Sequence, residues 1–489
     1  MKNTDSSFIK KHSFIIVFIL LYFVLVSVKI GLSNTPFYDW DESIYAQVGR
    51  EMIRDKSILV PIWQGKPWLD KPPIPSLFYG IIQLLPVSPE ISTRIATLFL
   101  SCIVLSLLYI LSYRITKDKL TSLLTIIITA FLPIFFQRSQ ALNVDVFLLL
   151  GWLGYIIWYH HIGLGSFFLV LAVLSKSLLG FFPPVIFFLY YLFAFITKQI
   201  TLKQLKKLMW KTSVQVGISS LWFIYMYIVY RYPFIRYQFL DSHFKRVTAS
   251  IEQHFGQRTF YITVLIDQFK LLLIPGFLSF LYLVFIFFKK KRKQYDILLS
   301  LFFLPWFIFL NLTKTKIEWY IYPVLPQFAF LASYPLYLLK KHAPLQIFLL
   351  LLLTSVYFLS ITPVNKLFTQ SFSSWEDHQL IALDAKKNRC RYLQVLVGED
   401  TRTSYATLKS MDLVISTTTW WGNHPSIAYY ADIKTSYLYS TEEARNQLDK
   451  LNPGGCLIVE KKDVSQFKNI KNEYKKLGTN TTYLLIKAD

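Results

Sequence analysis

The chain has 489 residues, of which 54% are hydrophobic, 17% aromatic and only 17% charged. A typical soluble domain has about 25% charged residues, so this composition excludes a disordered chain and argues against a soluble enzyme. The formal net charge is +23, from 52 Lys and Arg against 29 Asp and Glu. The basic residues stand in short clusters between apolar stretches, as in the cytoplasmic loops of membrane proteins. We therefore attribute the charge to membrane topology rather than to nucleic-acid binding.

Eleven apolar stretches, most of roughly 16–20 residues, predict transmembrane helices. The first follows Lys10-Lys11-His12 and is too long for a cleaved signal peptide, and no cleavage motif comes after it. We therefore expect an uncleaved helix whose start lies inside the cell. The predicted spans are 13–28, 95–112, 120–136, 145–159, 162–175, 178–196, 212–230, 269–288, 296–311, 321–339 and 344–361.

The parity of these spans places the strong basic clusters on the inner side of the membrane, as the positive-inside rule requires. These clusters are 113–119, 197–211, 289–293 and Lys340-Lys341. The same parity places the following segments outside: 31–94, 137–144, 176–177, 231–268, 312–320 and the tail from 362 onward.

The polar C-terminal part, 362–489, predicts a small α/β domain outside the membrane. Apolar runs at 392–397, 456–460 and 482–486 are typical of short buried strands, and 441–450 has a helical pattern. Cys390 and Cys456 would pair if this part lies outside the cell, and would otherwise remain two thiols. The expected fold class is an all-α polytopic membrane bundle over 1–361 with an extracytoplasmic α/β domain over 362–489.

The first outer loop, 31–94, contains the most informative motif. Asp39 and Glu42 have the spacing of a capping box for a helix that we expect to end near Arg54. This interpretation leaves Asp41 without a structural role, and we interpret Asp41 as catalytic. Further along the loop, Lys71 precedes Pro72-Pro73, where a helix is expected to begin and phosphate to bind; the alternative is an ion pair with Asp70.

Two more ionisable residues lie at the ends of predicted spans, on the same outer side. Asp145 begins one span and Lys176 ends the next, and ionisable residues at membrane depth are usually functional. The structural alternatives are an ion pair of Asp145 with Arg138 and an interfacial position for Lys176. Three further candidates lie in outer loops: His243, Lys316 and Tyr320. The alternative is a structural role for His243, and an aromatic belt with interfacial lysines for Lys316 and Tyr320.

The motifs of the first loop resemble those of bacterial membrane glycosyltransferases of the GT-C class. The resemblance is to two families, the protein O-mannosyltransferases (glycosyltransferase family 39) and the lipid A aminoarabinose transferases, and covers about residues 10–340. Asp145, Ser175-Lys176 and the segment from Lys316 to Pro323 follow in the same order. The motifs are Asp41-Glu42-x-x-Tyr45-Ala46, Arg50-Glu51-Met52, Leu59-Val60-Pro61, Gly65-Lys66-Pro67 and Asp70-Lys71-Pro72-Pro73.

This resemblance implies that a sugar is transferred, with inversion, from a polyprenyl-phosphate donor to a hydroxyl acceptor at the outer face of the plasma membrane. It implies that Asp41 is the general base and Asp145 a second catalytic acid residue, with Lys71 a phosphate ligand. The substrate-binding candidates are Glu42, Tyr45, Lys71, Lys176, His243, Lys316 and Tyr320. One departure is Ile44, where the lipid A transferases have a basic residue.

We expect membrane lipids and an unidentified acceptor (lipid, protein or glycan) as the other partners. The carboxylates of Asp39, Asp41 and Asp145 are of a type that binds Mg²⁺ or Mn²⁺, but we favour a reaction without a metal cofactor. The alternative function is a carrier or flippase for a polyprenyl-linked substrate, which predicts charges at the bilayer midplane and an internal repeat. A third interpretation is a scaffold whose outer tail binds a partner.

Overall fold

The computed structural model describes residues 13–33, 35–289, 298–360, 374–448, 454–467 and 474–488. The chain folds as two compact units. The first comprises Met1–Leu32, Arg94–Val229 and Gly256–Gln370, and the second comprises Ser33–Thr93, Tyr230–Phe255 and Ser371–Asp489. The predicted domain boundary between 361 and 362 lies outside the described residues and stays a prediction, as does the basic cluster beyond Lys289.

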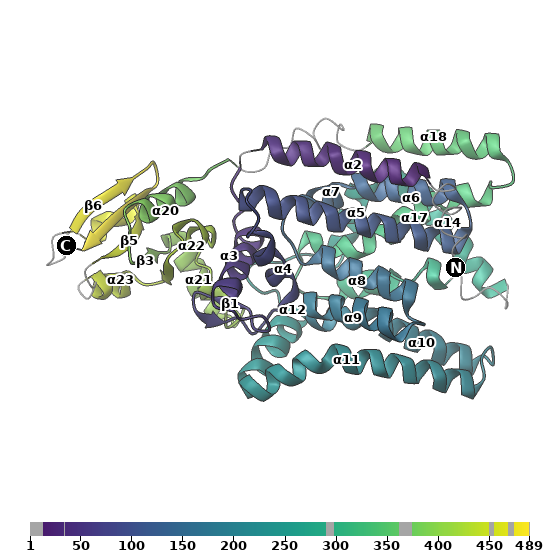
Figure 1. Ribbon diagram of the computed structural model, residues 1–489, viewed down its shortest axis with the longest axis horizontal. Coiled ribbons are helices and arrows are strands. Elements are labelled where there is room, and N and C mark those ends of the chain that lie inside the picture. Colours follow the sequence, from purple (N-terminus) through teal and green to yellow (C-terminus); the bar gives the residue numbers. More distant parts are fainter. Residues whose placement is uncertain are drawn as a thin grey trace. The chain divides into compact units, whose positions relative to one another are not determined.

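The first unit is a helical bundle (Figure 1). Proline at the first or second position begins several of its helices, such as α10, where a missing N–H costs nothing. Asp118 caps α6 by accepting the N–H of Thr121 at 2.8 Å. The helices are α2 (Ser13–Leu32), α5 (Pro89–Thr116), α6 (Lys119–Phe131), α7 (Pro133–Arg138), α8 (Asp145–Trp158), α9 (Ile162–Lys176), α10 (Phe182–Ile196), α11 (Leu202–Ile235), α13 (Phe260–Phe269), α14 (Leu273–Lys289), α16 (Leu304–Leu312), α17 (Leu325–Leu338) and α18 (Ala343–Ser360), with 3₁₀ turns η1 (Ser177–Phe181), η3 (Lys270–Leu272) and η4 (Glu318–Val324).

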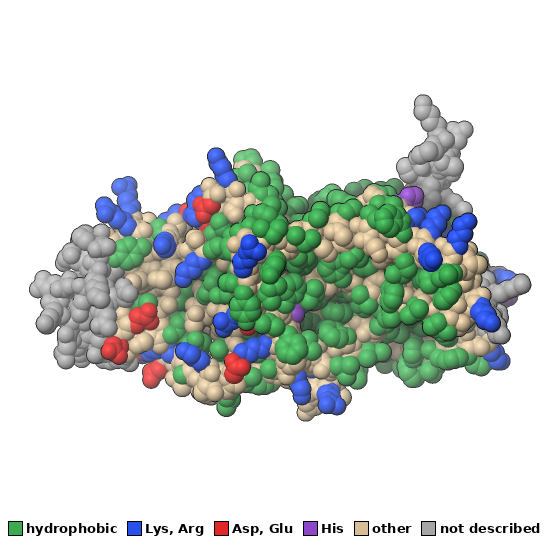
Figure 2. All heavy atoms as spheres, turned by 90° about the horizontal axis from the view of Figure 1, so that it is seen from below, with side chains coloured by type: hydrophobic (Ala, Val, Ile, Leu, Met, Phe, Trp, Pro, Cys, Tyr) green, Lys and Arg blue, Asp and Glu red, His purple; other side chains and the backbone are tan. Residues whose placement is uncertain are grey.

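Among the described residues, six helical segments are long and apolar enough to cross a membrane. Hydrophobic side chains are exposed along them (Figure 2), for example Leu221 and Ile228 of α11, which are 61% and 58% exposed. Such exposure is unfavourable in water and is satisfied by lipid. The chain is therefore a multi-pass membrane protein, while the predicted number of eleven spans stays a prediction.

The segment from 162 to 196, predicted as two spans, contains a sharp break at Ser177, whose φ is 56°. Immediately after the break, a Cβ atom on Gly180 would lie 2.4 Å from the Cα atom of Val173. The 3₁₀ turn η1 therefore packs directly against the end of α9, and only a glycine permits this approach.

The second unit contains the first long loop, a short segment before the eighth predicted span, and the C-terminal part. Its first two helices cross where their backbones touch, because a Cβ on Gly49 would lie 2.3 Å from the carbonyl oxygen of Ser76. These elements are α3 (Asp41–Arg54), the hairpin β1 (Ile62–Trp63) and β2 (Lys66–Pro67), α4 (Ile74–Ile82), the π-helix η2 (Arg236–Lys245) and α12 (Arg246–Thr248).

The C-terminal part forms a five-stranded sheet with the order β4-β3-β5-β7-β6. Strand β3 pairs in parallel with β4 and β5, while β7 pairs antiparallel with β5 and β6. The described elements are α20 (Asp377–Lys387), β3 (Tyr392–Leu396), α21 (Glu399–Ser410), η5 (Thr418–Trp420), α22 (Ser426–Ala431), β4 (Lys434–Leu438), α23 (Thr441–Leu448), β5 (Gly455–Glu460), η6 (Lys461–Phe467), β6 (Tyr474–Thr479) and β7 (Tyr483–Ala488). The three predicted strands and the predicted helix are confirmed.

A disulfide links Cys390, which precedes β3, to Cys456 in β5. Of the two alternatives that the sequence leaves open, pairing is therefore the one that the structure contains. The core of the sheet domain consists of buried apolar side chains: Leu396, Leu438, Ala444, Leu457, Val459 and Ile486.

Candidate functional site

A buried carboxylate with two cationic partners lies at the start of α8, in the first unit. Asp145 is the first residue of this helix and is fully buried. One carboxylate oxygen is 2.8 Å from Arg138 Nη2, and the other contacts Lys176 Nζ directly. The ion pair with Arg138 considered from the sequence is thus present. Lys176 also pairs with the carboxylate, with its side chain only 17% exposed, instead of extending to the interface.

Each of the two cations also lies over an aromatic ring. Lys176 Nζ is 4.7 Å from the ring centre of Tyr320, and the guanidinium carbon of Arg138 is 5.2 Å from that of Trp319. These cation–π contacts hold the cations in place without neutralising them. We name Arg138, Asp145, Lys176, Trp319 and Tyr320 the cationic cluster. Two cations against one carboxylate leave a net positive charge, which suits an anion such as a phosphate.

Lys316, also in the first unit, has structural partners of its own. Its Nζ donates to the carbonyl oxygens of Leu310 and Asn311 at 2.9 and 3.0 Å, and lies 5.1 Å from the ring centre of Tyr261. The two carbonyls belong to the last turn of α16, where a cation is favourable. These contacts explain Lys316 structurally, and its role in substrate binding stays a prediction.

The predicted capping box before α3, in the second unit, is wrong. The helix begins at Asp41 and its N-cap is Trp40, which makes no side-chain cap. Glu42 is buried and accepts the N–H of Tyr38 at 2.8 Å. Asp39 lies one residue too early, and its carboxylate instead contacts His424, 385 residues further along the chain.

Asp41, which is not needed for capping, occupies the first position of α3. The residue before it, Trp40, has a φ of 71°, a left-handed conformation that costs a residue with a side chain of order 1 kcal/mol or more. Such strain is concentrated at functional sites in proteins. Tyr45, one turn further along α3, is buried with its ring 6.0 Å from that of Trp68.

Lys71 lies before α4, where Pro73 is the N-cap and makes no side-chain cap. Its Nζ is 3.9 Å from Asp70 Oδ2, so the alternative ion pair is present at long distance. Asp70 is buried and accepts the hydroxyl of Ser242 at 3.4 Å. Burial raises the pKa of the Asp70 carboxyl, and the positive charge of Lys71 only partly opposes this rise.

His243 lies in the π-helix η2, with Nδ1 2.6 Å from the carbonyl oxygen of Gln238. This contact makes Nδ1 the donor nitrogen. A second histidine of the same segment, His254, has a pKa lowered by burial and by the charge of Arg246, while the charge of Asp41 opposes the change. The described residues of the second unit therefore place a neutral histidine within electrostatic reach of Asp41.

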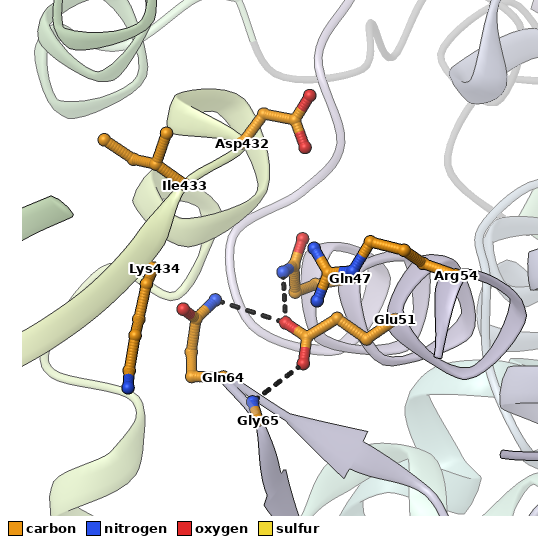
Figure 3. Close-up of a pocket in the computed structure, with 8 residues that line it drawn as sticks. All are labelled: Gln47, Glu51, Arg54, Gln64, Gly65, Asp432, Ile433 and Lys434. Atoms are coloured by element: carbon orange, nitrogen blue, oxygen red, sulfur yellow. Dashed lines mark hydrogen bonds between the residues drawn. The ribbon is translucent and has the colours of Figure 1, made fainter. Parts of the chain in front are cut away.

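A pocket of the second unit contains none of the predicted site residues (Figure 3). Its central group is Glu51, whose carboxylate accepts the N–H of Gly65 at 3.1 Å and the side-chain amides of Gln47 and Gln64. The lining residues are Gln47, Glu51, Arg54, Gln64, Gly65, Asp432, Ile433 and Lys434. This pocket therefore connects the Arg50-Glu51-Met52 and Gly65-Lys66-Pro67 motifs, which the sequence treated as separate.

Comparisons with known proteins provide sequence relatives and one fold. No family model matches the sequence. An uncharacterised protein of Aquifex aeolicus is 28% identical over 328 residues, 63% of this chain and 62% of the relative. An undecaprenyl phosphate-α-4-amino-4-deoxy-L-arabinose arabinosyl transferase of Wigglesworthia glossinidia brevipalpis is 30% identical over 127 residues, 26% of this chain and 22% of the relative. The chain thus spans less than two thirds of the length of the curated relatives it matches.

Two solved structures share the fold over nearly the whole chain. ArnT from Cupriavidus metallidurans bound to undecaprenyl phosphate superimposes with a TM-score of 0.66, covering 97% of this chain and 98% of that chain at 12% identity. The fold is that of ArnT. The apo state of ArnT gives a TM-score of 0.62 at 12% identity, with 98% of each chain covered. The ArnT likeness confirms the predicted fold class and the predicted resemblance to the aminoarabinose transferases.

Proposed function

We propose that this protein transfers a sugar from a polyprenyl-phosphate-linked donor to a hydroxyl acceptor, with inversion at the anomeric carbon. The observation that carries the proposal is the cationic cluster, a buried site of net positive charge at the end of apolar helices. Two comparisons support it. ArnT, which has the same fold, binds undecaprenyl phosphate in its crystal structure. The Wigglesworthia relative is an arabinosyl transferase whose named donor carries the same lipid phosphate.

The cluster suits the departure of the lipid phosphate. When the bond between the anomeric carbon and the phosphate oxygen breaks, the oxygen keeps the electron pair and gains negative charge. Cations that are already in place stabilise this charge more in the transition state than in the ground state. We assign this role to Lys176, with Tyr320 and Asp145 fixing its position. Lys71 stays a predicted phosphate ligand. Asp145 thereby retains its predicted place in the catalytic site.

The incoming hydroxyl requires a base. As its oxygen bonds to the anomeric carbon, its proton must leave, and a carboxylate in contact accelerates this step typically by about 10²–10⁴-fold. We assign this step to Asp41, as the resemblance implies, because it begins α3 directly after a strained residue. Glu42, Tyr45, His243 and Lys316 stay substrate-binding candidates.

We further propose that the reaction occurs at the outer face of the plasma membrane. The disulfide between Cys390 and Cys456 supports this location, because disulfides persist in oxidising compartments and are rare in the cytosol. A lipid-linked donor also explains a site at the edge of a bilayer, since its isoprenoid remains in hydrocarbon while its headgroup meets water. No metal cofactor is assigned to the reaction.

The test is sugar transfer by the purified full-length protein in liposomes. Labelled polyprenyl-phosphate sugars are supplied together with envelope acceptors, and labelled product is counted. We expect product with the wild type and a loss of about 10²–10⁴-fold with Asp41→Asn. The matched control is Asp55→Asn, which removes an exposed carboxylate just after the same helix and should retain full turnover.

Two outcomes would contradict the proposal. Full turnover by Asp41→Asn would remove the assigned base. Transbilayer movement of the donor without labelled product in any acceptor mixture would favour the alternative of a carrier or flippase.

A further inference from the structure

Three side chains of the types that bind transition metals meet in the second unit, and none of them is assigned to the reaction above. They are Asp39, His378 and His424, and one ligand atom from each lies within 4.8 Å of the others. Asp39 precedes α3, His378 lies in the first turn of α20, and His424 precedes α22. Residues so distant in the sequence form no local motif, so sequence analysis had no signal for this group.

The carboxylate of Asp39 is at the centre of the group. Its Oδ2 is 2.6 Å from His424 Nδ1 and 3.4 Å from His378 Nε2. Its Oδ1 accepts the backbone N–H of Ser426 at 3.0 Å, which fixes the orientation of the carboxylate. Burial opposes ionisation, but the hydrogen bond and charge of His424 outweigh it and lower the pKa of Asp39. The carboxylate is therefore available as a charged ligand at neutral pH.

His378 has an unsatisfied nitrogen close to this carboxylate. The side chain is 4% exposed, and Nε2 makes no hydrogen bond despite its burial. A buried polar atom without a partner costs about 1–3 kcal/mol, so such atoms usually have a ligand. The other ring nitrogen, Nδ1, lies 3.4 Å from Glu376 Oε2. Histidines that bind metals commonly have a carboxylate on the second nitrogen in this way.

The two imidazoles lie close together. Their rings stack with centres 3.9 Å apart at 17°. Burial, with the charge of His424, lowers the pKa of His378 to about 4.

The backbone around the group is fixed from several sides. Gln379, next to His378, donates its side-chain amide to the carbonyl oxygen of Phe37 at 3.1 Å. The N–H of Phe37 in turn donates to the hydroxyl of Tyr430, at 2.7 Å. The chain before Asp39 is thereby bonded to both α20 and α22, the two helices that flank the histidines. Such support is what a preorganised metal site needs.

We propose that Asp39, His378 and His424 bind one divalent ion of the zinc class, with water completing the coordination. Zinc takes His nitrogens and carboxylate oxygens at about 2.0–2.2 Å in a tetrahedron, which separates the ligand atoms by about 3.3–3.5 Å. The 3.4 Å between Asp39 and His378 fits this edge. The 2.6 Å between Asp39 and His424 is a hydrogen bond that opens by less than about 1 Å when the ion replaces its proton.

The ion has a structural role, because it links the segment before α3 to the C-terminal part of the same unit. The sequence analysis considered the carboxylates of Asp39, Asp41 and Asp145 as ligands of Mg²⁺ or Mn²⁺. The site proposed here shares only Asp39 with that set. The proposal does not depend on sugar transfer, and its test needs no substrate.

The test is metal binding by the full-length protein, purified in detergent without a histidine tag. After removal of metal by 1,10-phenanthroline and dialysis, Zn²⁺ is titrated and the bound metal is measured by mass spectrometry. We expect one equivalent per chain and a Tm that rises with the logarithm of free Zn²⁺, because the ion binds the folded state. Co²⁺ in the same site should give the strong visible absorption of a tetrahedral ion.

The variant His378→Ala with His424→Ala should lose the equivalent, the Tm response and the Co²⁺ spectrum. The matched control, His342→Ala, removes an exposed histidine of the first unit and should retain all three. Asp39→Asn, which preserves size, tests the site if the double variant does not fold, and should weaken Zn²⁺ binding at least tenfold. Wild-type protein that binds no Zn²⁺, or variants that bind as much as the control, would overturn the proposal.

Discussion

Removal of the disulfide should destabilise the C-terminal sheet domain by a calculable amount. The two cysteines are 66 residues apart in the chain. In the chain-entropy treatment, a cross-link that closes a loop of this length restricts the unfolded state by about 4 kcal/mol at 25 °C. We therefore expect Cys390→Ser with Cys456→Ser to lower the free energy of unfolding of this domain by up to that amount, which is roughly a thousandfold change in its unfolding equilibrium.

The assay is proteolysis of the purified protein at increasing urea concentration, with the fragments of the sheet domain followed on a gel. The midpoint should fall in the double variant. Dithiothreitol provides an internal control, because it should lower the wild-type midpoint by the same amount and leave the variant unchanged.

Equal midpoints for wild type and variant would refute the reasoning. A variant that remained sensitive to dithiothreitol would show that the reductant acts other than through this disulfide, because Cys102 is then the one cysteine left in the chain. The redox state in the cell tests the proposed location at the same time, since a cytosolic domain would have both thiols free.

Three further changes test the packing and the charges of the two units. Gly49→Ala should cost about 1–3 kcal/mol, because its Cβ would lie 2.3 Å from a backbone oxygen, and the Tm should fall. Asp70→Asn should raise the Tm at pH 7, because burial raises the pKa of Asp70 above its usual 3.8 and an ionised Asp70 therefore lowers stability. Arg138→Met should cost about 1.5–3 kcal/mol and lower the Tm, since buried Asp145 loses one of its two charge-assisted hydrogen bonds while Lys176 still balances its charge.

The first two of these changes have a matched comparison. Gly31→Ala introduces a Cβ with no atom within 4 Å and should leave the Tm unchanged, so equal effects at both glycines would contradict the close approach. Because the pKa of Asp70 is raised in the folded state, its protonated carboxyl makes its full contribution to the free energy of unfolding below about pH 3.8. This contribution is lost as the pH rises through the folded-state pKa. The advantage of Asp70→Asn should accordingly vanish near pH 4, and a gain independent of pH would point to a different cause.

The sequence predicted those elements whose signal is local. The apolar runs of β3, β5 and β7 identified three buried strands, and the apolar stretches identified the long helices. Strands β4 and β6 were not predicted, because their exposed faces carry polar residues such as Lys434 and Lys475, and edge strands need no continuous apolar run. Their place in the sheet is set by the strands beside them.

The candidate site shows the same limit more sharply. Asp39 and Glu42 matched a local capping pattern, yet the carboxylate of Asp39 found its partners in His424 and Ser426, nearly 400 residues away. No spacing rule carries that information. In contrast, Asp145 and Lys176 were selected because charges at membrane depth need partners, and the two side chains are partners of each other. The physical requirement selected both residues, although it named Arg138 rather than Lys176 as the partner of Asp145.

The cationic cluster also separates stability from function. A buried ion pair is often no more stabilising than apolar residues of the same size, and replacement of the whole set can gain about 1–4 kcal/mol. Removal of one partner alone is costly, because a buried charge is left behind. Stability therefore explains why Arg138, Asp145 and Lys176 occur together, but not why they occur at all among apolar helices. The proposed binding of an anion would explain their presence, because only an excess of fixed positive charge offers a lipid phosphate what the surrounding hydrocarbon cannot.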